Sequence, residues 1–471
     1  MHKFLQPTGI LLGVCLVIFV ILSWILFYQD TRALLAISNF FPTLRTSLFA
    51  TQTTLMHYKI NTVPTLIFAI FAIASFFFYY YSLKQNISVK KTIISSLVFG
   101  LLLYFSYPGL SSDIFSYIFS DRIETVYHQN VWQVVPLTHN SDPFAIMADW
   151  KNTTRVYGGV NQLIYTLPSM IGRNNVVLLV ALYKIVSSLF AIGIIWVLYL
   201  CLLDTEKNKQ HIARNLRMVI WNPLFLVELF GSGHNDSIMI FFSLLSYFFF
   251  QRKRFLLAGI VLACAVQVKI IPVLLFAFLT ISLLKNKAFK NTLLFVGSFL
   301  IINCISFWLM AVSPITFAQR VSYNAGVYWQ SLPNLLRQVD PHINILFTGT
   351  FILILCLFIV YQIRTKQNPL LIYAYSLVFY LFFFTTAYWN WYALWVLTLI
   401  PLLKVARFKL FVVLFSFTSL FAYPVLWLSF RYDYHNSIWP IFTYLFIFVL
   451  PAVIFFLSKN KTFAKHVALF S

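Results

Sequence analysis

The stretch "NVVLLVALYKIVSSLFAIGIIWVLYLCLL", residues 175–203, carries a single charged side chain, Lys184, along its whole length. A helix needs about 20 apolar residues to cross the hydrocarbon core of a bilayer, so this stretch is long enough to span a membrane. Similar apolar runs recur from one end of the chain to the other, and 61% of the 471 residues are hydrophobic while 10% are charged. The runs do not alternate as barrel strands would. We therefore predict an all-α, polytopic membrane protein.

The apolar runs suggest about 14 spans; several are short, so we expect roughly 12–14 transmembrane helices in a single membrane-embedded domain, residues 1–471. The run at 9–29 is longer than a usual signal segment and lacks a small-residue cleavage site, so we expect a retained first span. Pro223 should kink its span or start a turn there. The expected spans are 9–29, 63–82, 92–107, 175–203, 214–231, 236–251, 254–267, 270–284, 289–312, 345–363, 369–388, 390–404, 407–429 and 437–458.

The net charge of +22 invites a nucleic-acid interpretation, but the basic residues form short clusters between apolar runs, where they specify membrane topology. If the N-terminus is cytoplasmic, the loops on that side hold 22 of the 34 Lys and Arg residues. We therefore expect a multi-pass plasma-membrane protein with both termini cytoplasmic. Ten of the 12 acidic residues fall at or near the outer face. Either polar chemistry takes place there, or acids are kept away from the anionic inner leaflet.

The long outer segment 108–174 begins with an amphipathic stretch. We expect an interfacial helix there whose aromatic side chains dip into lipid. Its apolar face would hold Ile114, Phe115, Ile118, Phe119 and Ile123, and its polar face Asp113, Ser116, Ser120, Asp121 and Glu124. Asp113, at the mouth of this helix, could cap it. It could equally act as a general base at the membrane surface.

The stretch "WNPLFLVELFGSGHNDSIMIFF", residues 221–242, joins two spans at the outer face. Glu228 lies within an apolar run, where a carboxylate is costly unless it faces the protein interior or a wet cavity. His234, Asn235 and Asp236 open the next helix, whose free backbone N–H groups point outward. A helix cap with a structural acid would explain these residues, and so would a binding site.

Basic residues are few on the outer side. Lys269, in "VQVKIIP", and Arg320, in "FAQRVSYN", lie at outer span ends, and Lys184 lies within a span. Such side chains could bind a phosphate among the carboxylates. Snorkelling toward lipid headgroups is the alternative.

The stretch "TAYWNWYALW", residues 386–395, joins two further spans at the outer face. Its aromatic residues could form an interfacial belt. Asn390, flanked by Trp389 and by Trp391 and Tyr392, could instead be part of a stacking platform for a sugar or a lipid headgroup.

Several catalytic motifs are absent from the sequence. There is no phosphate-binding Gly-Lys-Ser/Thr loop, Rossmann glycine fingerprint, zinc-ligand spacing or serine elbow. No cytoplasmic segment is large enough to bind a nucleotide. A reaction at the outer face would therefore use a substrate delivered by the membrane, such as a lipid-linked one.

Six motifs resemble, in order, those of the GT-C glycosyltransferases that use polyprenyl-phosphate mannose, including glycosyltransferase family 87 and the bacterial α-1,6-mannopyranosyltransferases. "SSDIFSYIFSDR" resembles their D-x-x-x-Y segment, "HNSDPF" their NPY segment and "RVYGGVNQLIY" their YGP segment. "WNPLFLVELFGSGHNDSIM" is similar to their NP…E…GHND spans, "QVKIIP" to K-x-x-P and "WNWYALW" to PWYLLW. Gly159 replaces the proline of YGP here, and Asn390 that of PWY.

The resemblance implies a GT-C fold and an inverting transfer of a hexose, which is mannose in the family, from a polyprenyl-phosphate donor to a glycan or glycolipid acceptor at the outer face. Asp113 would be the catalytic base. The donor phosphate would be held by Lys269, with Arg320 or Lys184, and the sugar or acceptor by Glu228, His234, Asn235, Asp236, Tyr157, Asn390, Trp391 and Tyr392. Some relatives bind a divalent metal at such carboxylates and many need none, so no cofactor is firmly implied.

The main alternative is a transporter or flippase of a lipid-linked glycan, which would use the same residues for binding only. Such a protein should show related halves and charges near the membrane midplane, whereas this sequence shows no such repeat and its acids cluster at one face. A different sugar on the same chemistry stays open. The expected partners are the lipid-linked donor, the acceptor and membrane lipid, with no nucleic acid.

Overall fold

The computed structural model describes residues 7–29, 62–324, 329–337, 343–431, 438–458 and 467–470. Within these ranges the regular elements are helices, with one isolated bridge between Trp329 and Ala387. Six described helices are long and apolar enough to cross a membrane, and seven further apolar helices are shorter. The prediction of an all-α polytopic membrane protein is confirmed.

The helices of the first half of the chain are α1 (Pro7–Gln29), α4 (Thr62–Leu83), α5 (Val89–Tyr104), α6 (Asp113–Thr125), α7 (Gly159–Gly172), α8 (Val176–Thr205), α9 (Lys209–Ile220), α10 (Pro223–Leu226), η2 (Val227–Ser232) and α11 (Asp236–Gln251). The second half contains α12 (Phe255–Val268), α13 (Val273–Lys285), α14 (Phe289–Met310), α15 (Pro314–Asn324), α16 (Leu332–Arg337), α17 (Ile343–Arg364), α18 (Pro369–Phe379), η3 (Tyr380–Phe384), η4 (Asn390–Ala393), α19 (Leu394–Leu397), η5 (Ile400–Leu402), α20 (Ala406–Arg431), α21 (Trp439–Tyr444), η7 (Leu445–Val449) and α22 (Leu450–Leu457).

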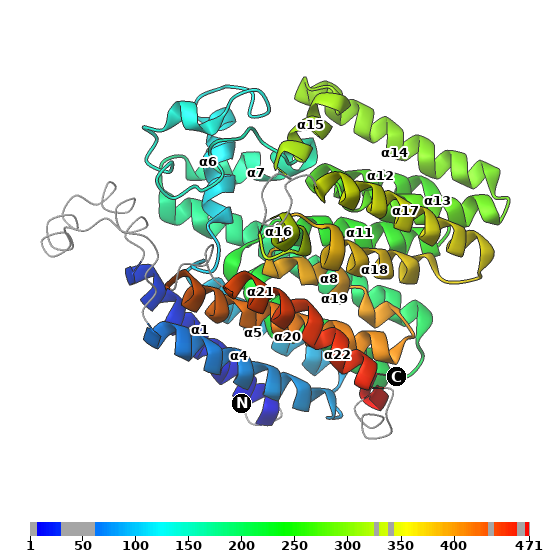
Figure 1. Cartoon of the computed structure of the whole chain (residues 1–471), viewed down its shortest axis with the longest axis horizontal. Helices are drawn as coiled ribbons and strands as arrows, with labels where there is room; N and C mark the ends of the chain where they lie inside the picture. Colours follow the sequence, from blue (N-terminus) through cyan, green and yellow to red (C-terminus); the bar gives the residue numbers. More distant parts are fainter. Residues whose placement is uncertain are drawn as a thin grey trace, which may run out of the picture.

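Helices from the two ends of the chain pack together. The blue α1 and α4 lie beside the orange and red α20 and α22, while α8, α11, α12 and α14 form a second group (Figure 1). The segment containing α6 and α7 lies beside the second group (Figure 1). Residues 30–61, between the first two expected spans, lie outside the described residues, as do the basic residues Lys3, Lys459, Lys461 and Lys465.

The surface of the helices is apolar and much of the polar chemistry is inside. Leu293 and Trp308 on α14 are 74% and 79% exposed, whereas Glu228 and Asp236 are completely buried. A water-facing surface rarely exposes so many large apolar side chains. This distribution is typical of a protein whose outside faces lipid.

The chain breaks at Pro223, as predicted. Helix α9 ends at Ile220, and Asn222 caps α10 by accepting a hydrogen bond from the Leu224 backbone N–H at 3.0 Å. Pro223 fits at the first helical position because its missing N–H would have no partner there. The chain then continues as the π-helix η2, which carries Glu228.

Helix α6 forms where the amphipathic pattern predicts a helix, but its predicted contact with lipid is wrong. Phe115 and Phe119 are buried at 3% and 1% exposure, and the opposite face, with Asp121, is buried as well. The reason is that the long segment 126–158 supplies partners: Arg155 pairs with Asp121. Helix α6 therefore lies within the protein, packed against α7 and α8.

Helix α7 presents an apolar face outward instead. Leu163 and Leu167 are 75% and 64% exposed, while Asn161 and Gln162 are buried. An outward apolar stripe with an inward polar one is the arrangement expected where a helix meets lipid. Within this segment, α7 rather than α6 therefore exposes an apolar face.

Candidate active site

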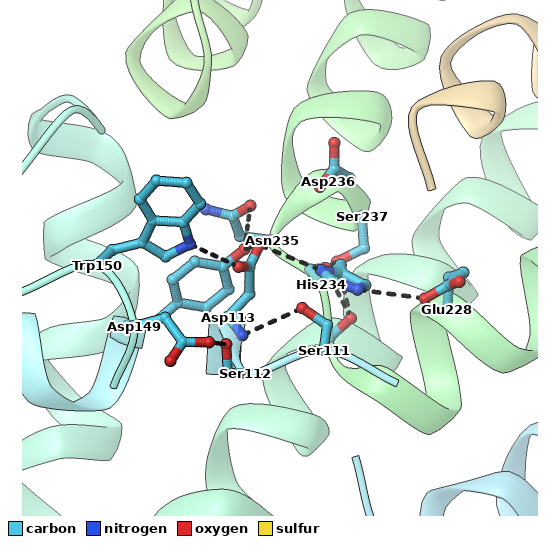
Figure 2. Close-up of polar contacts among 12 residues, drawn as sticks. Ser111, Ser112, Asp113, Asp149, Trp150, Glu228, His234, Asn235, Asp236 and Ser237 are labelled. Carbon is cyan, nitrogen blue, oxygen red and sulfur yellow. Dashed lines mark hydrogen bonds and ion pairs between the residues drawn. The ribbon is translucent and has the colours of Figure 1, made fainter. Parts of the chain in front are cut away.

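Asp113 is the first residue of α6, and its carboxylate lines a cavity. Oδ1 accepts a hydrogen bond from Trp150 Nε1 and Oδ2 accepts one from the Tyr117 hydroxyl, each at 3.1 Å (Figure 2). Ser112 occupies the N-cap position but makes no side-chain cap bond; its hydroxyl donates to Asp149. Two side chains therefore fix the Asp113 carboxylate while it stays 13% exposed.

Tyr117 also connects α6 to the start of α11, because its hydroxyl lies 3.2 Å from Asn235 Oδ1. Asn235 in turn donates to Asn161 Oδ1 on α7, at 3.3 Å. Burial and the nearby Asp113 charge raise the pKa of Tyr117 well above its usual value. Tyr117 therefore remains a neutral hydrogen-bond donor across the physiological pH range.

His234 lies between two carboxylates. Its Nδ1 is 3.8 Å from Asp113 Oδ2 and its Nε2 is 3.2 Å from Glu228 Oε2, at ion-pair rather than aligned hydrogen-bond geometry (Figure 2). Glu228 Oε1 accepts a hydrogen bond of 2.8 Å from the Tyr423 hydroxyl on α20. Both His234 and Glu228 are buried, so their interaction takes place away from water, where charged and polar groups interact more strongly.

Asp236 has a partner at each oxygen. Lys269 Nζ donates to Oδ2 at 2.6 Å and Trp395 Nε1 donates to Oδ1 at 2.7 Å. Asp236 is fully buried, whereas the Lys269 side chain is 13% exposed and lines the cavity. This pair places a cation at the cavity wall and keeps its counter-charge behind it.

Aromatic rings form another part of the cavity wall. Trp391 stacks on His234 with ring centroids 3.9 Å apart, and Trp389 lies parallel to Trp391 at 5.5 Å. Tyr392 stacks on Trp395 at 4.1 Å. Flat apolar ring faces beside charged and hydroxyl groups form the kind of lining that holds a sugar or another amphipathic ligand.

The cavity has a volume of about 260 Å³. Its lining comes from α6, the segment before α7, the α12–α13 junction and the residues around η3 and η4. It is made of Asp113, Ser116, Tyr117, Ser120, Trp150, Thr153, Thr154, Arg155, Val156, Tyr157, Lys269, Ile270, Ile271, Tyr380, Thr385, Thr386, Ala387, Trp389, Trp391, Tyr392 and Trp395.

Most of the site residues expected from the sequence come together. Lining residues among them are Asp113, Tyr157, Lys269, Trp391 and Tyr392. Buried residues among them are Glu228, His234, Asn235, Asp236 and Asn390. His234, Asn235 and Asp236 contact lining residues, whereas Glu228 reaches the site through His234. Asn390 lies between the lining residues Trp389 and Trp391 in sequence, and its Oδ1 has no hydrogen-bond partner within the described part of the chain.

Two expected phosphate ligands lie elsewhere. Lys184 is buried on α8, where Nζ donates to the backbone oxygens of Leu103 and Ser106 at the end of α5. Arg320 donates to the backbone oxygen of Trp132. Neither residue lines the cavity. These backbone oxygens give the buried ammonium hydrogen-bond acceptors, which explains how a lysine is accommodated within this span.

Sequence reasoning missed several groups at the site. Tyr117 follows Asp113 by four residues, the D-x-x-x-Y spacing that places both on one helix face, so its signal was available. Trp150 and Tyr423 carried no such signal, because they reach Asp113 and Glu228 only through the fold. Arg155, in the segment before α7, also lines the cavity.

The described residues contain no group of three or more His, Cys, Asp or Glu side chains placed to hold a metal ion. The acids at the site already accept hydrogen bonds or ion pairs from Trp150, Tyr117, Lys269 and Trp395. Asp113 and Asp236 thus each have two hydrogen-bond donors within the chain.

Comparison with known sequences finds a protein family that matches this chain. The family described as "Alpha-(1->6)-mannopyranosyltransferase, N-terminal domain" matches residues 17–285, more than half of the chain. The chain is also similar to "Alpha-(1->6)-mannopyranosyltransferase A" of Corynebacterium glutamicum, with 25% identity over 185 residues. That match covers 38% of this chain and 36% of the relative, so it spans only about a third of the relative's length.

Proposed function

Since this chain belongs to the alpha-(1->6)-mannopyranosyltransferase family, we propose that it is a membrane-embedded hexosyltransferase that transfers mannose from a polyprenyl-phosphate donor. The acceptor is a hydroxyl of a glycan or glycolipid at the extracytoplasmic face of the plasma membrane. The observation that carries the proposal is the Asp113 carboxylate, which lines the cavity with the His234–Glu228 pair behind it.

In the proposed reaction, Asp113 accepts the proton of the acceptor hydroxyl as that oxygen attacks the anomeric carbon. The bond from that carbon to the phosphate oxygen breaks, and polyprenyl phosphate leaves with the bonding electrons. A single displacement inverts the anomeric configuration. Proton transfer to a positioned base contributes about 10²–10⁴-fold to a rate.

The remaining groups support this step. Trp150 and Tyr117 fix the rotamer of Asp113, which keeps the acceptor oxygen in line with the anomeric carbon. Lys269 offers a positive charge to the leaving phosphate. Trp391 and Tyr392 supply ring faces for the sugar, and His234 positions the Asp113 side chain from behind.

The test is sugar transfer in membranes that contain the overexpressed protein, with radiolabelled polyprenyl-phosphate mannose as donor. Asp113→Asn should lower transfer by at least 10²-fold, the contribution expected of a general base. Asp204→Asn is the matched control, since Asp204 is an exposed acid paired with Arg252 and is not part of the cavity lining.

Unchanged transfer by Asp113→Asn, at equal protein level, would return Asp113 to the role of a helix cap. Movement of a lipid-linked glycan across the bilayer, with no new glycosidic bond, would favour the transporter alternative instead.

A further inference from the structure

The cavity wall contains an arginine that makes only part of its possible hydrogen bonds. Arg155 lines the cavity, and its side chain is only 1% exposed. Its Nη1 donates to Asp121 and lies 3.4 Å from Ser120 Oγ. Its Nε and Nη2 are buried and have no hydrogen-bond partner in the part of the chain that the structure describes. Buried donors without partners are costly, so a ligand is expected to complete them.

Arg155 is anchored rigidly from one side. Asp121 is fully buried and accepts hydrogen bonds from both Arg155 and the Tyr183 hydroxyl, the latter at 2.5 Å. Burial raises the pKa of Asp121, while the Arg155 charge acts in the opposite direction. Asp121 thus fixes one edge of the guanidinium and leaves the other edge for a second partner.

Arg155 and Lys269 flank the same ring. The Arg155 guanidinium carbon and Lys269 Nζ are each 5.9 Å from the centroid of Tyr157, which also lines the cavity. Two cations, each paired with a buried carboxylate, therefore flank one residue of the cavity wall. A guanidinium edge with two free donors matches the oxygens of a phosphate in a two-point contact.

The position of Arg155 relative to Asp113 suits a displacement. Asp113, Ser116 and Ser120 lie on one face of α6 and all line the cavity. Ser120, next to Arg155, is seven residues from Asp113, roughly 10 Å along the helix. An in-line reaction needs base, acceptor oxygen, anomeric carbon and leaving phosphate in sequence, with about 3 Å from base to acceptor oxygen, about 3 Å from that oxygen to the anomeric carbon, and then the bond that breaks. A phosphate at Arg155 would therefore be separated from the base by about this distance.

We propose that Arg155, together with Lys269, binds the phosphate of the lipid-linked donor. The identity of this ligand rests on the proposed function. Its chemistry, a phosphate monoester or diester carried by an apolar chain, does not. Arg155 takes the place that sequence reasoning gave to Lys184 and Arg320.

The test measures binding by the purified full-length protein in detergent, with farnesyl phosphate and farnesol as a matched pair of probes. Wild-type protein should prefer the phosphate. Arg155→Gln should weaken farnesyl phosphate binding about 10- to 100-fold, as expected for loss of charge-assisted hydrogen bonds, and leave farnesol binding unchanged. Arg122→Gln is the control, because Arg122 is a similarly buried arginine paired with Asp142 that does not line the cavity.

A purely structural ion pair would behave differently from a phosphate ligand. Asp121→Asn removes the counter-charge of Arg155, so phosphate binding should tighten or stay unchanged if Arg155 is a ligand. Equal losses of phosphate and farnesol binding in both Arg155→Gln and Asp121→Asn would overturn the proposal. If Arg155→Gln does not fold, Arg155→Lys, which keeps the charge but loses the planar edge, should still reduce the preference for phosphate over alcohol.

The binding assay separates this inference from the proposed function. Phosphate binding that depends on Arg155, in a protein that transfers no sugar from polyprenyl-phosphate mannose, would support the site and reject that donor. If the wild-type protein transfers sugar and the Arg155→Gln variant still prefers farnesyl phosphate over farnesol, the proposed enzyme function is supported and the role of Arg155 is overturned.

Discussion

At the scale of residues, hydrogen-bond partners hold the orientation of the carboxylates at the site. Asp113 has two donors, and Asp236 has Lys269 and Trp395. Such support keeps a reacting group within the narrow geometry that catalysis requires. The supporting residues should therefore affect turnover even though they accept no proton from the substrate.

Tyr117→Phe tests this support. The variant keeps the ring but removes the hydroxyl that bonds Asp113 and Asn235, so Asp113 should sample other rotamers. We expect kcat to fall about 10- to 100-fold with little change in the donor KM, because small misplacements of a base are costly. Steady-state kinetics in detergent would measure both values.

The matched control is Tyr127→Phe. Tyr127 also donates to an aspartate, Asp142 at 2.8 Å, but it does not line the cavity. Equal losses in the two variants would mean that Tyr117 acts only through general stability.

At the scale of elements, the connection between η2 and α11 determines where the site residues lie. Gly233 ends η2 with φ of +76°, and the next three residues are His234, Asn235 and Asp236. A side chain at Gly233 would strain the backbone and would meet Ile114 Cδ1 at 3.0 Å and Lys184 Cγ at 3.2 Å. The glycine thus allows the turn to approach both α6 and α8.

Gly233→Ala should lower the free energy of unfolding by roughly 1–3 kcal/mol, the cost of holding an alanine in this strained conformation. Sugar transfer should fall with it, because the turn carries His234. A thermal-unfolding assay in detergent would detect the change as a lower midpoint.

Gly297→Ala is the control for this substitution. Gly297 is within α14, and an added Cβ there would meet nothing within 4 Å. Alanine is favoured over glycine in a helix, so this variant should be neutral or slightly stabilised. A neutral Gly233→Ala would show that the turn tolerates a side chain.

At the scale of the whole molecule, the orientation of the bundle decides which compartment reaches the cavity. The distribution of Lys and Arg predicts that the segment with α6 and α7 lies outside and the connection between α8 and α9 inside. Asn140 and Lys207 are exposed residues in these two regions. They provide a direct test of orientation.

In intact cells, a membrane-impermeant maleimide should label Asn140→Cys but not Lys207→Cys, and both should react after the cells are opened. Labelling of the wild-type protein gives the background from its own cysteines, of which Cys304 and Cys356 are exposed in the structure. The reverse pattern would place the cavity on the cytoplasmic side and contradict the proposed use of an extracytoplasmic acceptor.

The sequence by itself determined the class of protein and its family. Hydropathy is summed along a local stretch, so runs such as 175–203 predict membrane helices without knowledge of their neighbours. The break at Pro223 is local too, since proline cannot donate a backbone hydrogen bond. The ordered motifs carried the family resemblance, which the match over residues 17–285 confirmed.

Only the tertiary structure decided which side chains share the cavity. The sequence suggested Lys184 as a phosphate ligand and did not single out Arg155, yet Lys184 bonds the end of α5 and Arg155 lines the cavity. The environment of α6 was also decided by the tertiary structure. An amphipathic pattern shows that one helix face is buried, but it does not show whether lipid or protein buries it. Contacts such as Glu228–Tyr423 join residues far apart in the chain, and no local pattern encodes them.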